Sequence, residues 1–243
     1  MSAKYSSSER RRSRPVQKRS KIKTLKKNKL AAFIVIFIVL TLVIGSFYAV
    51  VTNIGDSNSS RSNGGYQNDP EYKSALNNTK YPVAVLETSK GVMAIELYTD
   101  KMPKTCANFI KLVNDGFYNG MIFHRVKKGF MIQAGSTFPD GSKKTSPYGN
   151  IEFESSDDVT HVDGAISMAS TGAGVGGSSE FFICDGAQHS LDGKYAAFGK
   201  LIYGWSVLRE IASAPNDGSL EPIPGGGKPL EDVKIYRVSI VNQ

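Results

Sequence analysis

The pattern of apolar and polar residues divides the chain into a polar start, one long apolar run and a region of short alternating segments. From residue 81 onward, short apolar stretches are separated by Gly, Asp, Asn and Pro, which is typical of strands joined by turns. The stretches that predict strands are PVAVLETSKGVMAIELY (82–98, two strands around a turn), MIFHRV (121–126), FMIQAG (130–135), GAISMAS (164–170), EFFIC (180–184), YAAFGKLI (195–202) and VKIYRVSIV (233–241).

Two segments show a helical period instead. In DKMPKTCANFIKLVNDG (100–116), apolar side chains recur at i, i+3, i+4 and i+7, with a proline near the first turn and a glycine after the last. The segment GWSVLREIAS (204–213) predicts a second, shorter helix. We expect Cys106, Phe109, Ile110 and Val113 of the first helix, and Trp205, Leu208 and Ile211 of the second, to face the core. Many short strands with only two helices favour a mainly β domain, a closed antiparallel barrel.

The long apolar run from Leu30 to Val51 holds 22 residues without a charge and predicts a transmembrane anchor. As a helix it would be about 33 Å long, enough to cross a bilayer core of ~30 Å. A cleaved signal peptide is the alternative, but its apolar core is usually only about 7–15 residues. Lys and Arg crowd the N-terminal side of the run, which places the N-terminus in the cytoplasm and the remainder outside.

These features predict a single-pass membrane protein with four parts. Residues 1–29 form a basic disordered cytoplasmic tail, and residues 30–51 form the transmembrane anchor. Residues 52–80, rich in Asn, Ser and Gly, are expected to be a flexible linker, with Asn58 and Asn77 beginning sequons whose glycosylation stays open. Residues 81–243 form the folded, extracytoplasmic domain.

The charge is distributed unevenly along the chain. Residues 1–29 carry twelve Lys and Arg against one acid, a charge of +11, so the remainder carries −3 of the total of +8. The basic excess therefore belongs to the tail, where contact with anionic lipid is favoured. No nucleic-acid partner is expected.

The cysteines and histidines do not predict a disulfide or a metal site. Cys106 and Cys184 are too few for a disulfide framework and are expected to be buried thiols. The three histidines, His124, His161 and His189, lack the spacing of metal ligands.

A glycine pattern in GAGVGGSSEFF (172–182) raises the question of a dinucleotide site. Gly172, Gly174 and Gly177 match G-x-G-x-x-G, but a dinucleotide fingerprint needs a helix after the glycines. The segment that follows is β-rich, so we expect a surface loop between two strands. No cofactor is expected, although an oxidoreductase using this loop is kept as a minor alternative.

Two longer motifs, FHRVKKGFMIQAG (123–135) and SSEFFICDGAQHSLDGKYAAFG (178–199), resemble the cyclophilins, the peptidyl-prolyl cis/trans isomerases. The resemblance covers roughly residues 82–241 and includes KMPKTCANF on the first predicted helix and SMAS before the glycine loop. It implies a closed eight-stranded antiparallel barrel capped by two helices. It also implies proline-containing polypeptides as substrates and no cofactor.

The resemblance assigns roles to individual residues. It implies that Arg125 is the catalytic arginine and that Gln133 positions this arginine and the substrate carbonyl. His161 is interpreted as structural. The residues expected to bind substrate are His124, Phe130, Met131, Ala169, Ser170, Glu180, Phe182, Leu191 and Tyr195.

Three positions depart from the family pattern. Glu180 stands where a glutamine is usual, and as a neighbour of Arg125 it could orient the guanidinium or compete for it; a solvated glutamate at the rim is the alternative. We expect it to reduce turnover on neutral peptides. Ser190 stands where many members have the tryptophan that helps to grip cyclosporin, so cyclosporin should bind weakly. Tyr195 replaces a common histidine.

The function expected from the sequence is a membrane-anchored prolyl isomerase that assists the folding of exported or membrane proteins. The alternative is a cyclophilin-like module or chaperone that binds proline-containing peptides with little turnover.

Overall fold

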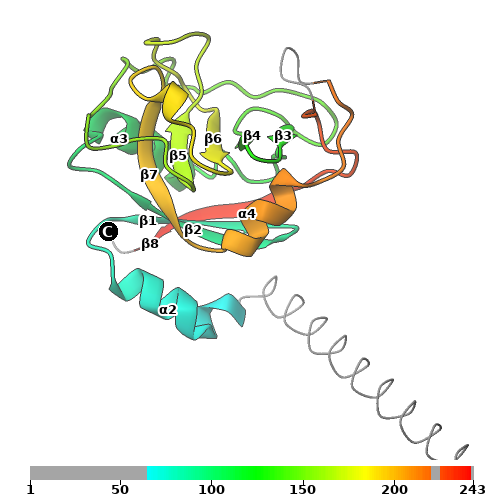
Figure 1. Cartoon of the computed structure of the whole chain (residues 1–243), viewed down its shortest axis with the longest axis horizontal. Coiled ribbons are helices and arrows are strands. Elements are labelled where there is room, and N and C mark those ends of the chain that lie inside the picture. The colour runs from blue at the N-terminus through cyan, green and yellow to red at the C-terminus, as the bar shows by residue number, and fades with distance from the viewer. Residues whose placement is uncertain (1–64, 220–224, 242–243) are drawn as a thin grey trace, which may run out of the picture. The chain divides into compact units, whose positions relative to one another are not determined.

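The computed structural model describes residues 65–219 and 225–241, and within these ranges the chain forms a β-rich unit with three α-helices (Figure 1). The predicted tail, the predicted anchor and the first part of the predicted linker lie outside the described residues. Within the described ranges, no helix combines the length and the hydropathy that a bilayer crossing requires.

Eight strands form one sheet in which all neighbouring pairs are antiparallel. Along the sheet the order is β3-β4-β6-β5-β7-β2-β1-β8. All strands and both helices predicted from the sequence are present. The strands are β1 (Val83–Thr88), β2 (Gly91–Leu97), β3 (Arg125–Lys127), β4 (Met131–Ala134), β5 (Ala165–Met168), β6 (Phe181–Cys184), β7 (Ala196–Tyr203) and β8 (Ile235–Val241), and the two predicted helices are α3 (Pro103–Asn114) and α4 (Trp205–Ala212).

The expected closed barrel is wrong in one respect, because the ladder of strands is open and the sheet is a half-barrel. Strands β3 and β8 are its two ends. Between them the described residues make isolated bridges, Ile122 with Lys234 and Val126 with Gly227, instead of a continuous ladder. The reason is length, since β3 has only three residues before the chain turns and cannot pair along the seven residues of β8.

Alternation along the strands separates two apolar layers. Of every two consecutive residues in a strand, one faces the main core. There Ile132, Ile166 and Ile183 pack with Phe109 of α3 and Leu208 of α4. The other side chains of β4, β5 and β6 face outward and form a second apolar cluster. This outward layer positions the candidate site.

Both cysteines are buried and unpaired, as predicted. Burial raises the pKa of each thiol, Cys106 and Cys184, to about 12, so both stay protonated at neutral pH.

Helix α3 lacks a capping side chain at its own N-cap, Met102, and is capped from a distant loop. The Glu154 carboxylate accepts hydrogen bonds from the backbone N of Lys104 at 3.2 Å, and from the backbone N and Oγ1 of Thr105 at 2.9 Å each. A carboxylate at this end also matches the positive pole of the helix dipole. Glu154 therefore anchors the loop before β5 to the helix.

The second half of the predicted linker is folded, which corrects the expected boundary at residue 81. Residues Gly65–Asn68 form a 3-10 turn, η1, and Pro70–Asn77 form helix α2, which the Asp69 side chain caps. The reason is two tyrosines within the polar composition, because Tyr66 and Tyr72 are buried against outward-facing side chains of β1, β2 and β7. Within the described residues, the folded domain therefore extends back to residue 65.

Candidate active site

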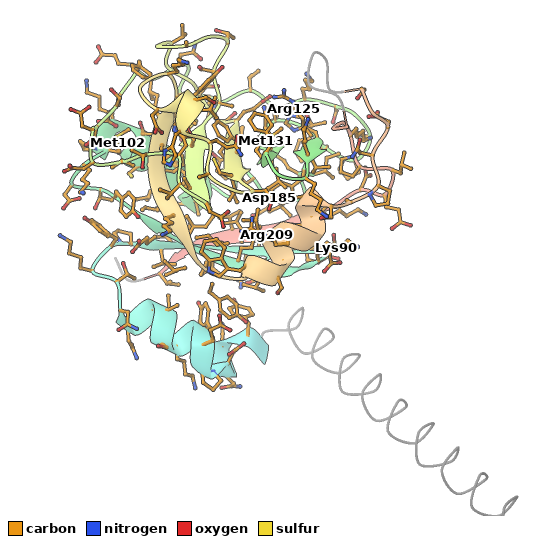
Figure 2. The ribbon with its side chains drawn as sticks, in the orientation of Figure 1. Lys90, Met102, Arg125, Met131, Asp185 and Arg209 are labelled. Atoms are coloured by element: carbon orange, nitrogen blue, oxygen red, sulfur yellow. The ribbon has the colours of Figure 1, made fainter. Side chains whose placement is uncertain are left out.

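Register across the sheet places the expected catalytic residues in one row. Arg125 of β3 is opposite Gln133 of β4, Gln133 is opposite Phe182 of β6, and Phe182 is opposite Ser167 of β5. Directly opposed residues of antiparallel strands project from the same face. The row therefore carries a cation, an amide and an aromatic ring side by side on the outward face. Figure 2 labels Arg125 at the β3 end of this row.

Beside this row lies the outward apolar cluster. Met131 and Phe182 are buried in it together with Cys184 and Ala165. The Phe182 ring meets the Tyr195 ring edge-on, with centroids 6.0 Å apart. The partly buried side chains that complete its walls are Phe130, Val162, Ala169, Leu191 and Tyr195. The cluster unites the apolar residues that the sequence assigned to substrate binding.

His161 belongs to this cluster, which the sequence analysis did not recognise. Its ring stacks on Phe182 with an interplanar angle of 13° and centroids 5.9 Å apart. His161 Nδ1 donates to Asp192 Oδ1 at 2.8 Å, and Ser167 Oγ lies 3.0 Å from Nε2. No local sequence signal connects these residues, because they come from two loops and a strand.

The trio Ser167, His161 and Asp192 has the hydrogen-bond order of a hydrolase triad but supports the site instead. Ser167 has no exposed surface and His161 has 1%. A nucleophile must reach a substrate carbonyl, and this hydroxyl is fully buried opposite Phe182 in the sheet. The trio therefore fixes the position of Phe182.

A polar relay extends from the row toward the rim. Arg125 Nη1 donates to Gln133 Oε1 at 2.9 Å, and Gln133 Nε2 donates to Glu180 Oε2 at 2.7 Å. The Glu180 carboxylate thus reaches the guanidinium through Gln133 and makes no direct ion pair with Arg125 among the described contacts. Burial lowers the pKa of Arg125, and Glu180 opposes that shift.

His124 lies at the end of the relay. Its Nε2 is 3.7 Å from Glu180 Oε2, while its buried Nδ1 has no hydrogen-bond partner among the described residues. Burial lowers the pKa of His124, and Lys143 and Arg125 act in the same direction, while Glu180 opposes them. The expected site-edge residue is therefore in place.

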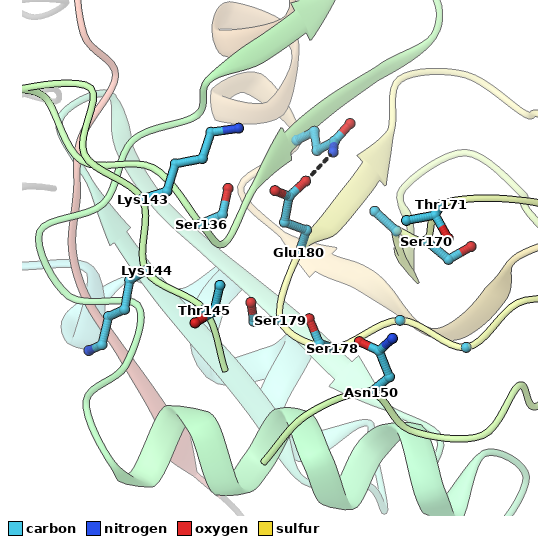
Figure 3. A pocket seen from close by; sticks show the side chains of 14 residues that line it. Ser136, Lys143, Lys144, Thr145, Asn150, Ser170, Thr171, Ser178, Ser179 and Glu180 are labelled. Atoms are coloured by element: carbon cyan, nitrogen blue, oxygen red, sulfur yellow. Dashed lines mark hydrogen bonds between the residues drawn. The ribbon is translucent and has the colours of Figure 1, made fainter. Parts of the chain in front are cut away.

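A polar pocket of about 290 Å³ adjoins the relay (Figure 3). Glu180 and Gln133 line one side, and Ala169 and Ser170 line another. Lys143 and the glycine loop complete the wall. The backbone at Ala169 and Ser170, which is expected to bind an extended peptide, thus borders both the apolar cluster and this pocket.

The glycine loop joins β5 to β6 and is followed by a strand, as predicted. Only Gly174 of the three motif glycines has a positive φ, at 71°. Gly177 is required for a different reason, because a Cβ there would collide with the Ala169 carbonyl oxygen. The glycines therefore let two backbone segments approach each other beside the pocket.

Comparison of the sequence with known proteins gives a consistent result. The profile of the family "Cyclophilin type peptidyl-prolyl cis-trans isomerase/CLD" matches residues 83–240. "Peptidyl-prolyl cis-trans isomerase CYP18-2" of Arabidopsis thaliana is 35% identical over 163 residues, which cover 66% of this chain and 94% of that protein. "Peptidyl-prolyl cis-trans isomerase-like 3" of Gallus gallus is 41% identical over 157 residues, 64% of this chain and 93% of that protein.

Solved structures agree with the sequence relatives. A cyclophilin type peptidyl-prolyl cis-trans isomerase of Cryptosporidium parvum superimposes with a TM-score of 0.60 and 32% identity, over 67% of this chain and 99% of that one. A second crystal structure of that protein, in the presence of the dipeptide Ala-Pro, gives a TM-score of 0.58 at 32% identity, over 66% and 99%.

Proposed function

The chain belongs to the family of cyclophilin-type peptidyl-prolyl cis-trans isomerases, and from that premise we propose that Arg125 catalyses the isomerisation of X-Pro bonds whose proline ring lies in the apolar cluster. Gln133 holds the guanidinium, and Phe130, Met131 and Phe182 receive the ring. The observation that carries the proposal is the row of Arg125, Gln133 and Phe182 on one face, with a 2.9 Å hydrogen bond between the first two.

The chemistry of the X-Pro bond explains how a fixed arginine can accelerate its rotation. The bond resists rotation because the nitrogen donates its lone pair into the carbonyl, and uncatalysed exchange takes tens to hundreds of seconds. Twisting the bond makes the nitrogen pyramidal and returns the lone pair to it. A hydrogen bond donated to the nitrogen is then stronger in the twisted state than in the planar one. Such a preference for the transition state is the condition for catalysis.

The free energy of a single hydrogen bond limits how much of the rate acceleration the arginine can supply. A hydrogen bond from a charged donor contributes about 1.5–3 kcal/mol, and each ~1.4 kcal/mol changes a rate tenfold. Arg125 thus supplies roughly one to two decades of acceleration. The apolar cluster supplies the remainder by holding the ring while the preceding carbonyl turns.

The test is cis/trans exchange of a short X-Pro peptide, measured by NMR with the purified full-length chain. Arg125→Ala should reduce the acceleration about ten- to a hundredfold. Arg237→Ala is the matched control, since Arg237 is an exposed arginine of β8 paired with Glu87. Equal acceleration by Arg125→Ala and the wild type would contradict the proposed role of the arginine.

A second function is favoured by the contact between Glu180 and Gln133. If the carboxylate holds the relay too firmly, the site binds proline-containing peptides without useful turnover. Peptide-induced shifts at Phe130 and Phe182 without faster exchange would identify such a binding module.

The clients we propose are exported or membrane proteins, encountered by a domain held outside the membrane by residues 30–51. The support is the uncharged 22-residue run and the basic residues before it. Protease added to intact cells should remove a C-terminal tag. Protection of the tag until the membrane is permeabilised would contradict this orientation.

Cyclosporin is proposed to inhibit this isomerase weakly. Ser190 occupies the place of the tryptophan that grips the drug in many family members, and it lies exposed in the 3-10 turn His189–Leu191. A titration of the exchange assay with cyclosporin should give weak inhibition, and Ser190→Trp should strengthen it. Tight inhibition of the wild type would contradict this expectation.

A further inference from the structure

An ionic bridge connects helix α4 to the walls of the apolar cluster. Arg209 donates from Nη1 to Asp185 Oδ1 and from Nη2 to Asp163 Oδ2, so one guanidinium joins two carboxylates. The Asp185 side chain is 6% exposed, whereas Arg209 is 42% exposed. Figure 2 labels both residues, with Arg209 on α4 and Asp185 next to it. The bridge lies outside the polar relay of Arg125.

The first arm of this bridge holds the turn between β3 and β4. The backbone N of Gly129 donates to Asp185 Oδ2 at 2.6 Å, and the backbone N of Asp185 donates to the Phe130 carbonyl at 2.9 Å. Asp185 directly follows β6, the strand that carries Phe182. It therefore fixes the Phe130 wall relative to Phe182.

The second arm holds the loop that leads to Leu191. The backbone N of Gly186 donates to Asp163 Oδ1 at 2.7 Å. Gln188 in the same loop donates from Nε2 to the Gly129 carbonyl at 3.0 Å, which ties the loop to the first arm. The Phe130 and Leu191 walls of the cluster are thus both connected to Arg209.

We propose that Arg209 is a positioning residue for the isomerase site, holding Asp163 and Asp185 so that the Phe130 and Leu191 walls keep the spacing that receives a proline ring. The proposal rests on the proposed function of the apolar cluster as the proline pocket. Without the guanidinium, two carboxylates would face each other and one of them would be buried without a countercharge. Removing one partner of a buried pair is strongly unfavourable, so the turn and the loop would separate.

The residue type suits this role. Arginine has a planar fork that can donate to two carboxylates at once, whereas lysine is a single compact charge. The Arg209 guanidinium also lies 5.7 Å from the Trp205 ring centroid, one turn earlier on α4. The fork is therefore fixed on the helix before it reaches the two loops.

The kinetic test uses the full-length chain and an X-Pro peptide. Arg209→Met should raise the KM roughly three- to tenfold and leave the kcat within about twofold, because a loosened pocket weakens ground state and transition state alike. The KM of Arg209→Lys should fall between that of the wild type and that of Arg209→Met. Glu210→Gln is the matched control, since the neighbouring Glu210 pairs with Lys90 on the helix surface. Its KM should equal that of the wild type.

A second readout separates this proposal from the proposed function. In spectra recorded without peptide, the amide signals of Gly129 and Gly186 should shift and exchange faster with solvent in Arg209→Met, and should stay unchanged in Glu210→Gln. If the wild type does not accelerate isomerisation, the proposed function fails while these two amides still report on the bridge.

Wild-type KM together with wild-type signals at Gly129 and Gly186 in Arg209→Met would overturn the proposal. If Arg209→Met does not fold, the same comparison is made with Arg209→Lys, and wild-type values there overturn it equally.

Discussion

At the scale of single residues, Glu180 is the acidic member of the polar relay that ends at Arg125. Its carboxylate accepts from Gln133 Nε2 and so turns the amide oxygen of Gln133 toward Arg125. The same negative charge attracts the guanidinium that, in the proposed mechanism, donates to the prolyl nitrogen. Glutamine at this position would keep the hydrogen-bond order without the charge.

We therefore expect Glu180→Gln to raise kcat/KM on neutral X-Pro peptides. A screened charge interaction of about 1 kcal/mol corresponds to roughly fivefold in rate. The measurement is the NMR exchange assay on the full-length chain, with Glu210→Gln as the control carboxylate. An unchanged or lower kcat/KM would mean that Glu180 orients the relay without opposing catalysis.

His161 makes stability depend on pH. Burial lowers its pKa below the usual 6.5, although the hydrogen bond to Asp192 opposes the shift. The unfolded chain therefore binds this proton at higher pH than the folded one, so stability is full above about pH 6.5 and falls as the pH drops below it. His124 contributes in the same direction.

The free energy of unfolding should thus decrease from pH 7 to pH 5, by at most about 1.4 kcal/mol per pH unit for each histidine. His161→Asn should be less stable at pH 7 but should show a shallower decrease, measured by urea unfolding at each pH. An equal slope in wild type and variant would assign the pH dependence to other groups.

The grouping of side chains was predictable where several residues of one motif lie on the same strand. Met131 and Gln133 alternate with the core residues Ile132 and Ala134 on β4, and the motif keeps them on one face. His161 and Lys143 were not predictable, because long connections bring them to the site from loops that carry no periodic signal. The local sequence pattern predicts on which face of the sheet a side chain lies. Which other residues it contacts there depends on the tertiary structure.

At the scale of elements, helix α3 depends on a residue almost fifty positions away. Glu154 satisfies backbone and side-chain donors of the first turn, whereas its neighbour Glu152 pairs only with Lys104 on the surface. A lost N-terminal cap costs about 0.5–2 kcal/mol, and an exposed ion pair contributes about 0–1 kcal/mol.

Glu154→Ala should therefore lower the free energy of unfolding by about 1–2 kcal/mol. Glu152→Ala should change it much less, because its ion pair with Lys104 is exposed to solvent. Both are read from urea unfolding of the full-length chain. Equal effects of the two variants would contradict the capping role.

Element types were predictable from the sequence, and closure of the sheet was not. Periods of 2 and 3.6 identified each strand and both core helices. Whether β3 and β8 pair depends on the length of β3, and the sequence shows no signal where that strand stops. The predicted segment MIFHRV begins four residues before Arg125, the first residue of β3.

At the scale of the whole molecule, helix α2 joins the chain that precedes the domain to the outer face of β1, β2 and β7. The Tyr72 ring lies edge-on to Tyr66 at 5.1 Å and to Tyr203 at 5.4 Å. Tyr203 also donates its hydroxyl hydrogen to Asp69 Oδ2 at 2.8 Å. The polar composition of residues 52–80 did not predict this docking, because the contact depends on only two tyrosines among Asn, Ser and Gly.

Tyr72→Ala should release α2 and lower the free energy of unfolding by about 3 kcal/mol, the usual effect of truncating a buried aromatic ring. The exposed Tyr236 of β8 provides the control, Tyr236→Ala. Isomerase activity should be unchanged in both, because α2 lies away from Arg125 and Met131 (Figure 2). Lost activity in a folded Tyr72→Ala would contradict the separation of the two faces.

The docking of α2 also decides how the domain would respond to mechanical load. A pull on the chain ahead of Gly65 would act first on η1 and α2, and would reach β1 only after both had peeled from the sheet. The strands that α2 covers, β7, β2 and β1, stand together in the strand order, whereas β3, β4 and β6 of the pocket begin that order at its other end. Under such a load α2 would therefore detach before the strands of the pocket are strained.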